Sequence, residues 1–152
     1  MYGSRFEQFS FVISSINRYI QKLERDEMVR YGFKGSYAQY LAALNHYPEG
    51  LTAARLCEIC DKDKAAVSRI AAEMIEKGLV VRESERDNLY RAKLKLTAEG
   101  KEAADYVVRR AQAAVDVVGS GLTDEDRKVF YAALDLIASK LQELTKEGIP
   151  GT

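Results

Sequence analysis

The chain has 152 residues, 47% of them hydrophobic and 30% charged, and its 23 basic and 23 acidic residues leave no net charge at pH 7. This composition is typical of a soluble globular protein and excludes a largely disordered chain. No stretch approaches the roughly 18 apolar residues of a membrane span, and the N-terminus lacks the apolar core of a signal peptide, so we expect no membrane partner. Two cysteines are too few for a disulfide framework, which favours a cytoplasmic protein.

Charge is distributed unevenly along the chain. Residues 62–95 contain nine Lys or Arg and six Asp or Glu, a balance of +3. Residues 120–152 contain four bases and six acids, a balance of −2. The basic middle is consistent with one surface that faces an anion, although such charge runs are usually solvated faces.

The N-terminal part predicts two helices. Residues 6–28 carry apolar side chains at a 4-3-4-3 spacing, which places them on one helical stripe. Gly32 and Gly35 bracket a break, and residues 36–46 predict a second helix with Ser36 as its N-cap. The first stripe consists of Phe9, Ile13, Ile16, Ile20 and Leu23.

Residues 52–96 predict a short helix, a tight turn, a longer helix and a β-hairpin. The short helix begins at Thr52 and ends near Cys60, and Asp63 caps the next helix, residues 64–77. Gly78 ends that helix. The hairpin consists of residues 79–81 and 89–96 around the polar turn 84–88. The inward face of the longer helix is formed by Val67, Ile70, Ala71 and Met74.

Two further helices follow the hairpin. One opens at Thr97 and runs to about residue 118, and Gly119 to Gly121 break it. The other begins near Thr123, which resembles the start of a capping box with Asp126. It repeats the 4-3-4-3 spacing at Phe130, Leu134, Ile137, Leu141 and Leu144.

The second helix of a helix-turn-helix can enter the DNA major groove, which is about 12 Å wide. Here its outer flank is short and basic: the alanines allow close approach and can touch thymine methyls, and Arg69 can bind guanine or phosphate. Asp63 leaves the helix N-terminus near the anion. A basic hairpin tip can enter a minor groove, although lysines on the outer strand can equally protect an exposed edge. The candidate DNA contacts are Thr52, Asp63, Lys64, Ala65, Ala66, Ser68, Arg69, Arg86, Arg91 and Lys93.

The motifs D-K-x-x-V-S-R at residues 63–69, E-K-G-L-V at 76–80 and L-T-x-x-G at 96–100 make the chain resemble the MarR family of transcriptional regulators. The resemblance covers nearly the whole chain. It implies an obligate homodimer, formed by the first and the last two helices, that binds pseudo-palindromic double-stranded DNA and is often controlled by a small effector. The family's wing motif D-x-R is replaced by Asn88, Leu89 and Tyr90, so Arg86 or Arg91 would have to supply the wing arginine. The helix-turn-helix turn also departs from the family, with Asp61 and Lys62.

These observations predict a mainly α fold with a small β-hairpin wing, a winged helix-turn-helix lobe joined to a helical dimerisation lobe. Residues 35–97 are expected to bind DNA, and residues 1–34 and 98–148 to dimerise. The predicted function is that of a sequence-specific DNA-binding regulator, a repressor, and not an enzyme. The alternatives are a winged-helix protein-interaction module that does not bind DNA and a thiol-based redox sensor.

Two remaining sets of residues admit more than one reading. Tyrosines are expected where helices one and two face the winged lobe, and they could hold a small aromatic effector or simply pack. Cys57 and Cys60 form a C-x-x-C motif that could be structural core, a redox pair or, less readily, part of a metal site. With one histidine in the chain, we expect no metal and no cofactor. The effector candidates are Tyr19, Tyr31, Tyr37, Tyr40 and His46.

Overall fold

The computed structural model describes residues 3–84 and 91–151. They form two compact units, divided between Gln112 and Ala113 inside the long helix α5. None of the described helices is both long and apolar enough to span a membrane. The elements in chain order are α1 (Arg5–Tyr31), the 3-10 turn η1 (Gly35–Tyr37), α2 (Ala38–His46), β1 (Leu51–Thr52), α3 (Ala53–Cys60), α4 (Lys64–Glu76), β2 (Val80–Glu83), β3 (Lys93–Leu96), α5 (Ala98–Gly119) and α6 (Asp124–Glu147).

Helix α1 is bounded by two local signals. Ser4 caps it by accepting a hydrogen bond from the Glu7 N–H at 3.1 Å. Gly32 ends it in the left-handed region (φ +113°), a conformation that a side chain disfavours. Only Met28, near the C-terminal end of α1, is buried, so the predicted stripe stays largely exposed within this unit.

The prediction that Ser36 caps the second helix is wrong. The chain first makes the turn η1, whose Tyr37 N–H donates to the Lys34 carbonyl at 3.0 Å, and α2 begins only at Ala38. The residue before α2 is therefore Tyr37, in a helical conformation and without a side-chain capping bond. Because the turn already supplies helical geometry, α2 needs no separate cap.

The helix-turn-helix forms as predicted. Thr52 caps α3 by accepting from the Arg55 N–H at 3.2 Å, and Asp63 caps α4 by accepting from the Ala66 N–H at 2.7 Å. Between them Asp61 takes the left-handed conformation (φ 50°, ψ 53°) that more often needs glycine. Gly78 (φ +76°) follows the end of α4, and its N–H donates to the Ile75 carbonyl at 3.0 Å.

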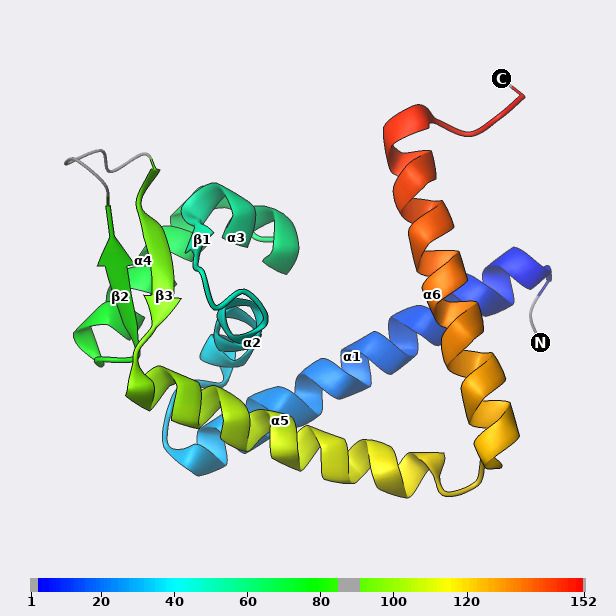
Figure 1. Cartoon of the computed structure of the whole chain (residues 1–152), viewed down its shortest axis with the longest axis horizontal. Coiled ribbons are helices and arrows are strands. Elements are labelled where there is room, and N and C mark those ends of the chain that lie inside the picture. The colour runs from blue at the N-terminus through cyan, green and yellow to red at the C-terminus, as the bar shows by residue number, and fades with distance from the viewer. Residues whose placement is uncertain (1–2, 85–90, 152) are drawn as a thin grey trace. The chain divides into compact units, whose positions relative to one another are not determined.

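The sheet has three antiparallel strands in the order β1-β3-β2, beside helices α3 and α4 (Figure 1). Strand β1 was not predicted; it is two residues long and pairs Leu51 with Leu94. The predicted strand 89–96 is shorter than expected, because β3 begins at Lys93. Leu89 and Tyr90 lie outside the described residues.

The helices and the sheet of the first unit pack around one apolar core. It contains Met28 of α1, side chains of α2, α3, α4 and the sheet, and Ala103, Ala104 and Val107 of α5. Among the described residues no polar or charged residue is buried. The first turn of α5 is fixed by Thr97, whose hydroxyl donates to the Gly78 carbonyl at 2.6 Å and accepts from the Gly100 N–H at 3.0 Å. The core therefore sets the position of α4 and leaves its outer flank free.

The second unit contains the end of α5, a short break and α6. Thr123 caps α6 by accepting from the Asp126 N–H at 3.1 Å, in agreement with the predicted helix start. Arg127 closes the break by donating to the Gly119 carbonyl at 2.9 Å. No residue of α6 is buried, so its apolar stripe lies open.

Candidate nucleic-acid interface

Helix α4 has one buried face and one open flank. Val67, Ile70, Ala71 and Met74 are buried, as the apolar spacing predicts. Lys64, Ala65, Ser68 and Arg69 are exposed, and Ala66 is half-buried. Ala72, one turn further along, is exposed as well and was not predicted; its spacing of seven from Ala65 could have identified it. We call the exposed set Lys64, Ala65, Ser68, Arg69 and Ala72 the α4 flank.

The α4 flank has the size and chemistry of a surface that reads a DNA groove. The side chains of Ala65, Ser68 and Ala72 are small, so the helix backbone can come close to base edges. Arg69 has neither an ion pair nor a hydrogen bond within the described part of the chain, so its guanidinium is available to guanine or to a phosphate.

Thr52 and Asp63 already use their side chains as N-caps. Each accepts a backbone N–H of the helix that it starts, so their first role is to fix α3 and α4. Thr52 also pairs with Lys93 in the register of β1 and β3. Two predicted contacts from residues 41 positions apart in the chain thus lie side by side, at the start of α3.

The hairpin is described only in part. Arg86, the predicted wing-tip contact, lies outside the described residues. Arg91 is exposed and precedes β3, and Lys93 is exposed on β3. Lys95 on the same strand is instead paired with Glu83 of β2 at 2.7 Å. Arg82, exposed on β2, was not singled out by sequence because its strand is too short to show a clear alternation.

The five effector candidates occupy different environments. Tyr37 and Tyr40 are buried in the core, whereas Tyr19 is 61% exposed, beside Arg18. Tyr31 is half-buried against Phe33 and Tyr106, with ring centroids 5.9 and 4.9 Å away. His46 is exposed at the end of α2 against the Tyr47 ring. Burial, followed by a hydrogen bond to Glu73, raises the pKa of Tyr37 to about 12.

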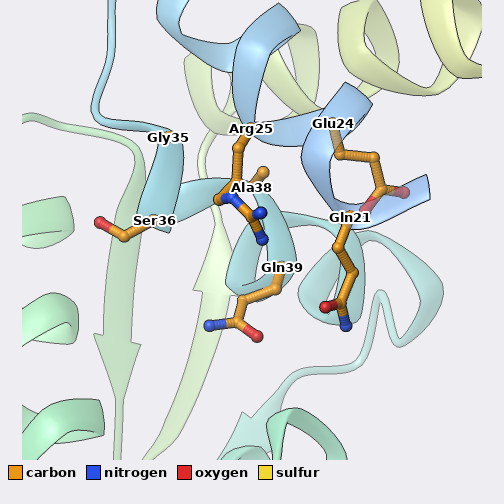
Figure 2. Close-up of a pocket in the computed structure, with 7 residues that line it drawn as sticks. All are labelled: Gln21, Glu24, Arg25, Gly35, Ser36, Ala38 and Gln39. Carbon is orange, nitrogen blue, oxygen red and sulfur yellow. The ribbon is translucent and has the colours of Figure 1, made fainter. Parts of the chain in front are cut away.

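Two hollows of the described surface lie near these residues, and none of the five lines either. The first, of about 30 Å³, lies between α1 and the segment from η1 to α2 (Figure 2). Partial burial there raises the pKa of the Glu24 carboxyl, against the opposing charge of Arg25. The second, of about 220 Å³, lies beside the start of α5. Both are below the roughly 300 Å³ at which ligand pockets usually begin. The first is lined by Gln21, Glu24, Arg25, Gly35, Ser36, Ala38 and Gln39, and the second by Leu44, Asn45, Pro48, Leu96, Thr97, Ala98 and Lys101.

Cys57 and Cys60 are free, half-buried thiols that pack against the core. Burial, with a smaller effect of Cys57, raises the pKa of the Cys60 thiol to about 11, which disfavours the reactive thiolate. In residues 3–84 and 91–151 no three His, Cys, Asp or Glu side chains gather as a metal site would require.

The comparisons with known proteins agree with this geometry. A MarR family model matches residues 31–88, whereas no curated protein matches the chain. A MarR family regulator from Silicibacter pomeroyi is 23% identical with a TM-score of 0.72, over 86% of this chain and 88% of that one. A MarR regulator from Methanosarcina mazei Go1 is 20% identical with a TM-score of 0.77, over 91% and 99%. A MarR family regulator from Listeria monocytogenes, complexed with 26mer DNA, is 18% identical with a TM-score of 0.72, over 92% and 95%.

At these identities the solved structures establish the fold, and the family model adds a match in sequence. The match includes α2, α3 and α4 and so contains the α4 flank. Both the predicted fold class and the predicted resemblance are confirmed. Residues 31–88 therefore match the MarR family model, within a chain that has the fold of the MarR family transcriptional regulators.

Proposed function

We propose that this chain is a sequence-specific DNA-binding repressor that acts as a homodimer. The observation that carries the proposal is the α4 flank: a short-side-chained, basic helix surface that is exposed while the opposite face of the same helix is buried. The fold similarity to the Listeria regulator, which is complexed with 26mer DNA, supports it.

Three groups of residues would make different contacts with DNA. Ala65, Ser68 and Arg69 would contact base edges in the major groove. Thr52 and Lys93, side by side at the start of α3, would contact phosphates and fix the register without specifying sequence. Arg86 and Arg91 of the wing would reach the flanking minor groove, where A·T tracts concentrate negative potential.

A homodimer would cover two stripes that their own units leave exposed. Ile16 and Leu23 of α1 are 44% and 45% exposed, and Phe130 and Leu141 of α6 are 44% and 48% exposed. Pairing with a second copy would remove these stripes from water, and the two-fold axis would match a two-fold operator. In this proposal residues 1–34 and 98–148 dimerise, residues 35–97 bind DNA, and half-sites lie about 10 bp apart.

A small aromatic effector that lowers DNA affinity is part of the proposal. Among the candidate residues Tyr31 is best placed to contact it, because its ring is half-buried and stands beside those of Phe33 and Tyr106. Such a site would form by displacement of packed rings, since neither of the two hollows described above includes them. NMR tests this part separately: the solvent exposure of the Tyr31 ring is measured with and without added phenolic compounds, and a bound compound should lower it.

Selection of bound sites from random duplex DNA tests the central part. The proposal predicts enrichment of one pseudo-palindrome with half-sites one helical turn apart, and a dimer in analytical ultracentrifugation. A monomer, or a pool without an enriched sequence, would contradict it and favour a protein-interaction module.

A further inference from the structure

The carboxylate of Glu73 lies on α4 and is held by two residues that precede α2. Its Oε2 atom accepts a hydrogen bond from the Tyr37 hydroxyl at 2.9 Å and pairs with Lys34 Nζ at 2.9 Å. Tyr37 is buried, whereas the Lys34 side chain is 64% exposed. The tyrosine is thus the fixed partner of Glu73, and lysine is the mobile one.

Glu73 is also placed to interfere with Arg69. The two residues are four positions apart on α4, the spacing at which opposite charges pair across one helical turn. In the structure they form no ion pair, although the guanidinium contributes to the lowered pKa of Glu73, after the hydrogen bonds from Lys34 and Tyr37. A glutamate carboxyl is ionised at neutral pH with or without these hydrogen bonds, so a released Glu73 carboxylate would compete with DNA for Arg69.

We propose that Tyr37 and Glu73 are positioning residues of the DNA-binding surface: the Tyr37 hydroxyl, assisted by Lys34, holds the Glu73 carboxylate away from Arg69 and keeps the guanidinium available to DNA. This inference rests on the proposed function. It assigns a role in DNA affinity to a core tyrosine that does not touch DNA, and it joins the turn η1 to the α4 flank through one hydrogen bond.

One Tyr→Phe substitution, made in the wild type and in two variant backgrounds, tests the inference. Tyr37→Phe removes one oxygen and keeps the ring, and the freed Glu73 should then lower affinity for the selected duplex up to about twofold, the strength of an exposed i,i+4 pair. In the Glu73→Gln and Arg69→Ala backgrounds the same substitution should leave affinity unchanged. Tyr131→Phe is the matched control, because it removes a phenolic hydroxyl from a tyrosine that is 50% exposed on α6, and it should bind as wild type does.

The outcomes separate this role from a purely structural one. An equal loss of affinity in all three backgrounds would mean that the hydroxyl only supports the fold, and no loss in the wild-type background would also overturn the inference. A second readout needs no DNA: the Arg69 Nε–H resonance of the free protein should shift in Tyr37→Phe and not in Tyr37→Phe/Glu73→Gln. If wild type binds no duplex, the proposed function fails, and this resonance alone decides the inference: an unchanged resonance overturns it.

Discussion

Gly100 offers the sharpest test of how the core positions α4 and α5. It lies in the first turn of α5 against the backbone of Leu79, which is fully buried. A Cβ on Gly100 would overlap the Leu79 carbonyl oxygen and lie 2.9 Å from the carbonyl carbon, where ordinary contacts begin at 3.4 Å. α5 would have to move by at least about 0.5 Å to clear the carbon, and further to clear the oxygen.

That movement has a definite energetic cost. The same Leu79 oxygen accepts the Thr97 N–H at 3.0 Å, so the shift also weakens a hydrogen bond worth about 1 kcal/mol. Overpacking costs about 1–3 kcal/mol, and the better helix propensity of alanine returns about 1 kcal/mol. We therefore expect Gly100→Ala to lower the free energy of unfolding by about 2 kcal/mol.

Urea denaturation followed by circular dichroism measures this change, at one fixed protein concentration because a dimer would make the midpoint concentration-dependent. Gly121→Ala is the matched control: a Cβ there meets no atom within 4 Å, and its φ is not positive. It should stay within about 0.5 kcal/mol of wild type. A Gly100→Ala variant as stable as the Gly121→Ala variant would refute the reasoning.

Three further predictions concern the site. Asp63→Ala should lower the free energy of unfolding by about 1 kcal/mol through loss of the α4 cap, whereas Asp63→Asn should keep the stability, since asparagine caps equally well; equal losses in urea denaturation would contradict the capping role. In a Cys57→Ser variant, Cys60 should react with iodoacetamide at pH 7.5 at least about tenfold more slowly than free glutathione does. Burial raises the pKa of the Cys60 thiol to about 11, so little of this thiol is ionised at pH 7.5. A Cys60 thiol that reacts as fast as glutathione would revive the redox-sensor alternative. Lys93→Ala should weaken binding to selected and unselected duplexes alike. It should also make the slope of log affinity against log salt concentration about one unit shallower, because one phosphate contact is lost. An unchanged slope would show that Lys93 is not part of the interface.

The features that could be predicted from sequence are those set by neighbouring residues. The caps at Thr52 and Asp63 are hydrogen bonds between residues three positions apart in the chain. The buried face of α4 follows from the spacing of Val67, Ile70 and Met74. Each depends on the chain within one or two helical turns, so one sequence is enough to indicate it.

The features that were missed depend on distant partners. Strand β1 forms by pairing Leu51 and Thr52 with distant residues of β3, and two residues are too few to show a strand period. Lys95 is engaged by Glu83 on a neighbouring strand, and Glu73 by Tyr37, 36 residues away. The start of α2 was misplaced because the preceding turn η1 has no sequence signal of its own.

The central claim is tested most directly by fluorescence anisotropy of the wild type, Arg69→Ala and Arg109→Ala on the selected duplex and on a scrambled duplex. Arg109→Ala is the matched control, because it removes the same charge from an exposed position on α5. The account predicts that Arg69→Ala weakens binding to the selected duplex by about 1–3 kcal/mol and narrows its preference over the scrambled one, while Arg109→Ala binds as wild type does. Equal affinity of Arg69→Ala and wild type for the selected duplex would contradict the assignment of the α4 flank as the surface that reads DNA.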